Sequence, residues 1–233
     1  MAITRTAKGT AASKAGADPW TALTSITMTT GDTIVVGVVV NNGISVAGVT
    51  WNGTSLGLDA ETAVFGVCIG YVFSLANVTG GTGDIVVDFG TSPDSTALFA
   101  LSLSGIATAS HVDRTTDATG ASDAPSSGAT AATTQNDEFL LGAVFTRGPS
   151  TDTAGTWGGD TTTTGQRVGT TGASANSNAT ASEGYDLQVA TGTRTASKSG
   201  ITSRSWGAAI VTYKAAAAVL NPGMFLMFPQ GRG

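Results

Sequence analysis

Thr33-Ile-Val-Val-Gly-Val-Val-Val40 is an almost continuous run of β-branched residues. Gly31-Asp32 precedes this run and Asn41-Asn-Gly43 follows it, and both flanks have the composition of turns. A short apolar run bounded by turns predicts a strand that is buried on both faces. We therefore expect residues 33–40 to form such a strand.

The sequence after this run continues the β pattern. Val49-Thr-Trp-Asn-Gly-Thr-Ser-Leu56 places Asn-Gly between apolar residues, which is the strongest short signal of a β-hairpin. Further strands are predicted over residues 64–75, 84–89, 97–104 and 208–214. No window of helical length carries apolar residues at a 3.6-residue spacing. The chain is therefore predicted to be all-β.

An internal repeat divides the chain. Residues 29–39 are echoed by residues 133–144 and Trp51-Asn-Gly53 by Trp157-Gly-Gly159, at an offset of about 105 residues. We expect an N-terminal leader (1–19), a first β half (20–107), a linker (108–130), a second β half (131–214) and an extended apolar C-terminal arm (215–233). The predicted fold is a jelly-roll-like two-sheet β-sandwich with an internal pseudo-repeat. Whether the halves form one sandwich or two stays open.

The order of these motifs resembles a β-sandwich module of phage structural proteins and large bacterial surface proteins. The motifs that carry the resemblance are the Gly-Asp-Thr-Ile-Val-Val strand, the Trp turn, Gly80-Gly-Thr-Gly-Asp-Ile-Val-Val-Asp-Phe89, Ala97-Leu-Phe-Ala-Leu-Ser-Leu-Ser-Gly105 and their counterparts in the second half. The resemblance implies a virion or cell-surface setting and no catalytic residues.

Composition excludes several classes of function. Charged residues make up 12% of the 233 residues, against about 25% in a typical soluble domain. The net charge is -5 and no cluster of lysines or arginines occurs, which argues against binding nucleic acid or an anionic membrane. Cys68 is the single cysteine, so an intramolecular disulfide is excluded. The N-terminal residues lack the apolar stretch of a secretory signal, so we expect a protein made and assembled in a cytoplasm.

Residue types that often carry chemistry are present without a catalytic or metal-binding pattern. His111, the single histidine, lies in the predicted linker, and we expect it to be solvated. Asp113, Asp117 and Asp123 lack the spacing of a calcium loop. Asp84 and Asp88 lie four residues apart on one predicted strand face, too far apart for a glycosidase pair. The chain is therefore predicted to be non-enzymatic and to need no cofactor or metal.

Tryptophans offer one possible ligand site. Trp51 and Trp157 occupy equivalent predicted turns and could form a stacking platform for a glycan. Packing in the core is the competing interpretation, since aromatic residues commonly lie in sandwich cores.

The C-terminal arm is predicted to mediate assembly. Met224-Phe225-Leu226-Met227-Phe228 is an apolar segment between two prolines. Such a segment needs a covering surface, either on its own domain or on a neighbouring subunit. The resulting hypothesis is a phage virion protein, specifically a capsid decoration or cement protein, whose partners are copies of itself and a major capsid protein. The alternatives are a tail or fibre component and a carbohydrate-binding or adhesin module.

Overall fold

Seventeen strands form the computed structural model, which describes residues 2–14, 17–172 and 175–217. The first half contains β1 (Thr4–Lys14), β2 (Trp20–Met28), β3 (Thr33–Val40), β4 (Gly48–Trp51), β5 (Thr54–Ser55), β6 (Gly57–Glu61), β7 (Ile69–Leu75), β8 (Gly81–Asp88) and β9 (Ser95–Ser104). The second half contains β10 (Val112–Ser122), β11 (Ser126–Ala129), β12 (Glu138–Thr146), β13 (Ala154–Gly159), β14 (Thr163–Gly169), β15 (Thr180–Gln188), β16 (Thr195–Ile201) and β17 (Arg204–Lys214). A 3-10 turn, η1 (Ala175–Ser177), precedes β15.

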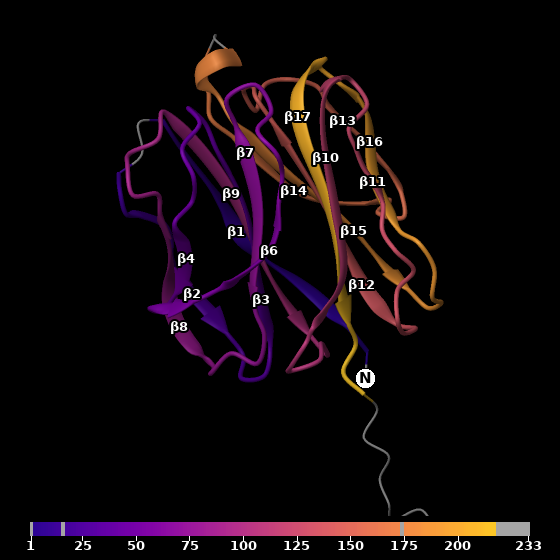
Figure 1. Cartoon of the computed structure of the whole chain (residues 1–233). Helices are drawn as coiled ribbons and strands as arrows, with labels where there is room; N and C mark the ends of the chain where they lie inside the picture. The colour runs from indigo at the N-terminus through magenta and orange to yellow at the C-terminus, as the bar shows by residue number, and fades with distance from the viewer. Residues whose placement is uncertain (1, 15–16, 173–174, 218–233) are drawn as a thin grey trace, which may run out of the picture.

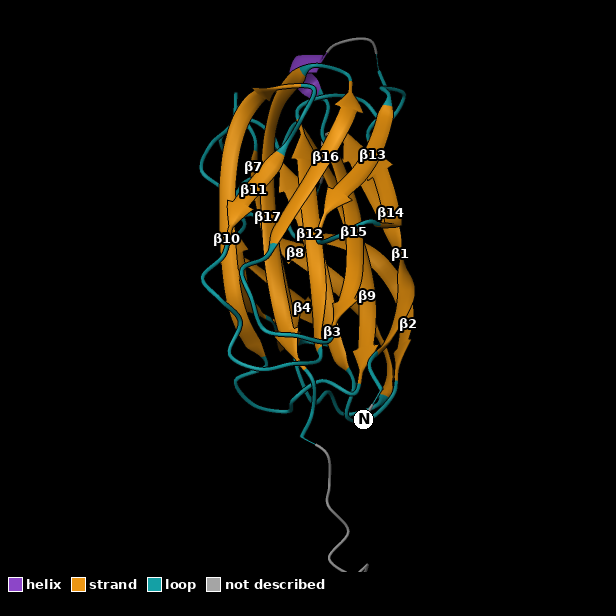
Figure 2. Cartoon of the chain, turned by 90° about the vertical axis from the view of Figure 1, so that its right-hand side faces the viewer, coloured by secondary structure: helices purple, strands orange, loops and turns teal. Residues whose placement is uncertain are grey.

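The strands form four antiparallel sheets stacked as four layers, which Figure 1 shows edge-on. The two inner sheets have the orders β1-β9-β3-β7-β6 and β10-β17-β12-β15-β14. The outer sheets, β2-β8-β4-β5 and β11-β16-β13, each cover the far face of one inner sheet, and Figure 2 looks onto the second of them. An all-β sandwich is thus confirmed, but it has four sheets where the sequence predicts two.

The two halves have the same strand order. The inner sheets correspond position by position, with β1 matching β10, β9 matching β17 and β6 matching β14. The predicted leader contains β1, and the predicted linker contains its counterpart β10 together with β11. These segments are strands despite their weak apolar pattern because β1 pairs with β9, and β10 pairs with β17, along most of their length. The prediction that residues 1–19 and 108–130 lie outside the β halves is therefore corrected.

Three hydrophobic clusters fill the spaces between the four layers. The cluster between the inner sheets draws side chains from both halves, and each of the other two lies under one outer sheet. All eight residues of β3 are buried, because an inner strand has a layer on each side. The prediction for residues 33–40 is confirmed. The Asn52-Gly53 hairpin is confirmed too, since β4 pairs with β5 and both turn residues have positive φ.

The inner sheets face each other in a reciprocal way. β1 of the first half contacts β14 of the second, and the corresponding β10 contacts β6. Each half also places a phenylalanine on a glycine of the other: the Phe145 ring lies on Gly70, and the Phe65 ring lies on Gly207. The two phenylalanine contacts involve different strands of the two halves, since Gly70 lies on β7 and Gly207 lies on β17.

Candidate functional site

An apolar hollow lies at the end of the molecule where β12 begins and β15 ends. Its volume is about 180 Å³. It is lined by Ala2, Ile3, Asp137, Glu138, Leu187, Gln188 and Val189. The lining residues come from the segment before β1, the start of β12, and the end of β15 with the residue that follows it. The hollow thus spans both halves of the chain.

Two exposed apolar side chains form the rim of this hollow. Leu187 is 51% exposed and Val189 is 75% exposed. Leu187 pairs with Phe139 of β12, and Val189 begins the loop after β15. Both side chains line the hollow, so its rim is apolar and open to solvent.

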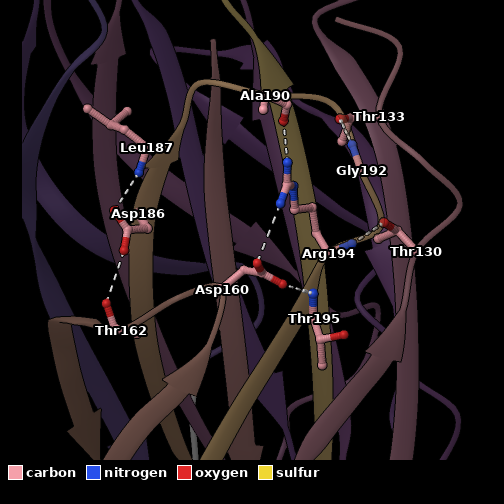
Figure 3. Close-up of polar contacts among 10 residues, drawn as sticks. All are labelled: Thr130, Thr133, Asp160, Thr162, Asp186, Leu187, Ala190, Gly192, Arg194 and Thr195. Carbon is pink, nitrogen blue, oxygen red and sulfur yellow. Dashed lines mark hydrogen bonds and ion pairs between the residues drawn. The ribbon is translucent and has the colours of Figure 1, made fainter. Parts of the chain in front are cut away.

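A polar network holds the loop that follows this rim (Figure 3). The Arg194 guanidinium donates to the Ala190 carbonyl and lies 3.5 Å from an Asp160 carboxylate oxygen. Asp160 also accepts from the Thr195 amide at 2.7 Å, and the Arg194 amide donates to Thr130 Oγ1 at 3.0 Å. Residues 190–195 are therefore tied to the elements around them. Polar contacts thus hold the loop that follows the rim in place. A surface that is already ordered loses less entropy on binding.

Asp186 fixes the strand end that carries Leu187. One of its carboxylate oxygens accepts from the Leu187 amide at 2.8 Å, and the other accepts from Thr162 Oγ1 at 3.0 Å (Figure 3). The Asp186 side chain thus holds the backbone of Leu187 in place, while the Leu187 side chain stays exposed.

Glu138 places a titratable carboxyl at the wall of the hollow, where it is 1% exposed. Burial raises the pKa of Glu138 to about 7, and the neighbouring Asp113 carboxylate adds to that rise. Asp113 itself accepts from the amide and the hydroxyl of Thr134, both at 2.5 Å, and lies 3.8 Å from the Lys214 ammonium. Near neutral pH, Glu138 is therefore divided between its neutral and charged forms.

The last described residues of the chain lie beside this hollow. The Ala215 amide donates to the carbonyl of Asp137, a lining residue, at 3.1 Å, and the Ala216 amide donates to the Gly105 carbonyl at 2.8 Å. β17 therefore ends at the same end of the molecule as the N-terminus (Figure 1). The predicted assembly segment, Met224–Phe228, lies outside the described residues.

His111 is not the solvated linker residue that the sequence predicts. Its ring is half-buried and stacks on Tyr213 with centroids 6.0 Å apart, and its Nε2 lies 2.7 Å from Ser74 Oγ. Burial lowers the pKa of His111, and the Lys214 charge lowers it further. Beside this pair the Tyr213 hydroxyl donates to Asp59 at 2.7 Å, and burial raises the pKa of Asp59 to about 6. The four side chains form a polar cluster that joins the two halves.

The distance between Ser74 Oγ and His111 Nε2 is short enough for a serine nucleophile and a histidine base. Ser74 is only 2% exposed, however, and it lies in the interface between the halves. Within the described chain no hydrogen bond joins His111 to a carboxylate, because Asp59 accepts from Tyr213 instead. The geometry therefore fits a polar contact between sheets and does not provide a cleft for a substrate.

The two candidate glycan-stacking residues are buried. Trp51 on β4 is 3% exposed and Trp157 on β13 is 5% exposed. They occupy corresponding strands and lie in separate clusters, each under its own outer sheet. Neither ring offers a face to solvent, so the positions fit the core-packing interpretation.

The acidic residues considered from the sequence have local roles. Asp84 accepts from the Ser25 amide at 2.9 Å, and Asp88 accepts from the Gly90 amide at 3.0 Å. Across residues 2–14, 17–172 and 175–217, no group of three or more His, Cys, Asp or Glu side chains is placed to hold a metal ion. Cys68 is buried, and burial raises the pKa of its thiol to about 12. The described part of the chain also has no helix with the length and apolarity of a membrane span.

Comparison with known proteins adds no relative. No protein-family model, curated protein or solved structure matches the chain.

Proposed function

We propose that the chain is a non-enzymatic structural protein of a phage virion, specifically a capsid decoration protein. In this proposal Met224–Phe228 of one copy packs into the hollow beside Leu187 and Val189 of a second copy. The observation that carries it is the position of this hollow, which lies beside Ala215, close to the last described residue of the chain. The resemblance of the motif order to phage structural proteins supplies the virion setting.

The size of the hollow favours a second copy as the partner. A volume of about 180 Å³ is below the roughly 300–1,000 Å³ of pockets that enclose a whole small ligand. It can therefore cover only part of a segment with five large apolar side chains. A contact between two copies supplies the additional apolar surface, because each copy brings its own segment and its own rim.

The surface composition supports dense packing of copies. With 12% charged residues, neighbouring copies would bring few charges out of water when they come into contact. Desolvation of charged groups is a major cost of protein contacts, so a surface rich in hydroxyl groups lowers that cost.

Light scattering of the purified chain tests the assembly step. We expect the full chain to form a defined oligomer and a variant lacking residues 221–233 to be a monomer with an unchanged melting temperature. The double variant Leu187→Ser, Val189→Ser should also be monomeric, although its C-terminal segment is intact. Leu58→Ser is the matched control, since Leu58 is 52% exposed on β6. A monomeric full chain, or unfolding of the deletion variant, would overturn the proposal.

The virion setting needs its own test. Mass spectrometry of purified phage particles from the source should detect the chain at a stoichiometry comparable to that of the shell protein. Its absence from such particles, together with an intact oligomer in solution, would refute the virion role while leaving the assembly contact in place.

A further inference from the structure

A second hollow lies inside the second half, between the inner sheet and the outer strands β13 and β16. It is small, about 10 Å³, which is room for about one water-sized group. The polar side chains around it include Asp152, Arg167, Ser182, Lys198 and Arg204. Three cationic side chains thus surround one small space, with a single carboxylate.

The carboxylate of Asp152 forms its ion pair with Arg204 and also acts on the charge of Arg167. Arg204 pairs with Asp152, with Nη2 and Oδ1 2.8 Å apart. Arg167 donates to backbone carbonyls, those of Ser150 at 2.6 Å and Asp152 at 3.0 Å. These carbonyl bonds orient the Arg167 guanidinium without neutralising its charge.

Lys198 is the most buried of the three cations, at 5% exposed. Its ammonium donates to Ser182 Oγ at 3.2 Å and lies 5.0 Å from the centroid of the Trp157 ring. A hydroxyl and a ring face compensate only part of the cost of burying a charge. Burial lowers the pKa of Lys198 to about 8, with Arg167 contributing, so the ammonium is still largely charged at neutral pH.

The first half shows that the architecture does not require a cation at this position. Lys198 pairs with Trp157 across β16 and β13. In the corresponding strands of the first half, Ile85 pairs with Trp51 and is fully buried. An apolar residue therefore fills the equivalent place beside the equivalent tryptophan. The second half carries a buried ammonium there, with the Arg167 guanidinium nearby.

We propose that this hollow binds a single halide ion, held by Lys198 and Arg167. The charge of the lining selects an anion. The small volume favours a monatomic anion, because phosphate, sulfate and carboxylates are all larger than a halide ion. Binding would compensate the buried charges and stabilise the second half by mass action. The inference is independent of the proposed assembly role, since none of these residues lines the apolar hollow.

Thermal unfolding in two salts tests this site. Melting temperatures of the full chain are measured in sodium chloride and in sodium gluconate at matched ionic strength and neutral pH. Chloride should give a saturable additional rise of roughly 2–4 °C or more. Lys198→Met should lose the difference between the two salts. Lys8→Met is the control and should keep it, because Lys8 donates to the Thr27 carbonyl at an exposed position.

A measurement on the unaltered protein covers the case in which Lys198→Met does not fold. Crystals grown in bromide should show an anomalous peak within contact distance of Lys198 Nζ and the Arg167 guanidinium. The chloride-specific rise should also shrink as the pH passes above about 8, where the Lys198 ammonium loses its proton. Equal melting temperatures in chloride and gluconate, or an anomalous map with no peak in the hollow, would overturn the proposal.

Discussion

The Phe145 ring of β12 lies on Gly70 of β7, so a side chain from one half occupies the place that a Cβ would take in the other. Phe145 is fully buried in the cluster shared by the two inner sheets. The two sheets can approach closely at this point only because residue 70 has no side chain. The fit between the halves at this point therefore depends on Gly70.

Gly70→Ala is expected to destabilise the fold by about 1–3 kcal/mol, the usual cost of overpacking a core. The added methyl group would overlap the Phe145 ring and force the inner sheets apart. Urea unfolding followed by tryptophan fluorescence measures the loss. Gly48→Ala is the matched control, since a Cβ on this β4 glycine meets nothing within 4 Å. Equal stabilities for the two variants would contradict the proposed close fit.

Arg5→Met is expected to destabilise the protein by about 3–5 kcal/mol, because it leaves a buried carboxylate without its cation. Arg5 binds Glu183 through two hydrogen bonds of 2.5 and 2.7 Å, and the Glu183 side chain is fully buried. The double variant Arg5→Met, Glu183→Leu should recover most of the loss. A double variant that is no more stable than Arg5→Met would show that the pair contributes through packing and not through charge. Equilibrium unfolding of all four proteins gives the coupling energy.

Glu138→Gln is expected to stabilise the protein above neutral pH and to have little effect in acid. The folded state raises the pKa of Glu138 from 4.5 to about 7, so it binds the proton more tightly than the unfolded chain does. The wild-type fold therefore loses stability as the pH rises from 4.5 through 7. Above pH 7 the variant should exceed the wild type by on the order of 2–3 kcal/mol. Unfolding free energies measured across this range check the sign, and a constant difference at all pH values would contradict it.

Tyr213→Phe is expected to raise the pKa of Asp59 further above about 6 and to cost about 1–2 kcal/mol. The Tyr213 hydroxyl donates to the Asp59 carboxylate, and this bond stabilises the charged form. A carbon-detected NMR titration of Asp59 measures the shift. A pKa for Asp59 that is unchanged or lower in the variant would show that the hydroxyl does not stabilise its charge.

The sequence predicts the central strands well and the outer members of the inner sheets poorly. Residues 33–40 and the Asn52-Gly53 hairpin carry strong local signals, a β-branched run and a turn that needs two residues with positive φ. β1 and β10 consist mainly of Thr, Ala, Ser and Gly, so their apolar periodicity is weak. They form strands because β9 and β17 supply hydrogen-bonding edges, which a local pattern cannot show.

The candidate site depends on contacts that local sequence does not encode. Leu187 and Val189 lie in an alternating stretch that is typical of a half-buried strand, whereas the structure leaves both exposed at the hollow that Ile3 also lines. His111 meets Ser74 through the pairing of two halves distant in sequence. Trp51 and Trp157 are buried, as the core-packing interpretation predicts. That interpretation needed only the general tendency of aromatic residues to lie in sandwich cores.

The contact between the two inner sheets has a consequence for the behaviour of the chain at low concentration. Two separate chains that met through the same inner sheets would dissociate as their concentration fell. Here the connection between β9 and β10 keeps each half at a fixed and high effective concentration near the other. The contact between the two inner sheets is therefore intramolecular. It stays formed in a single chain at any dilution.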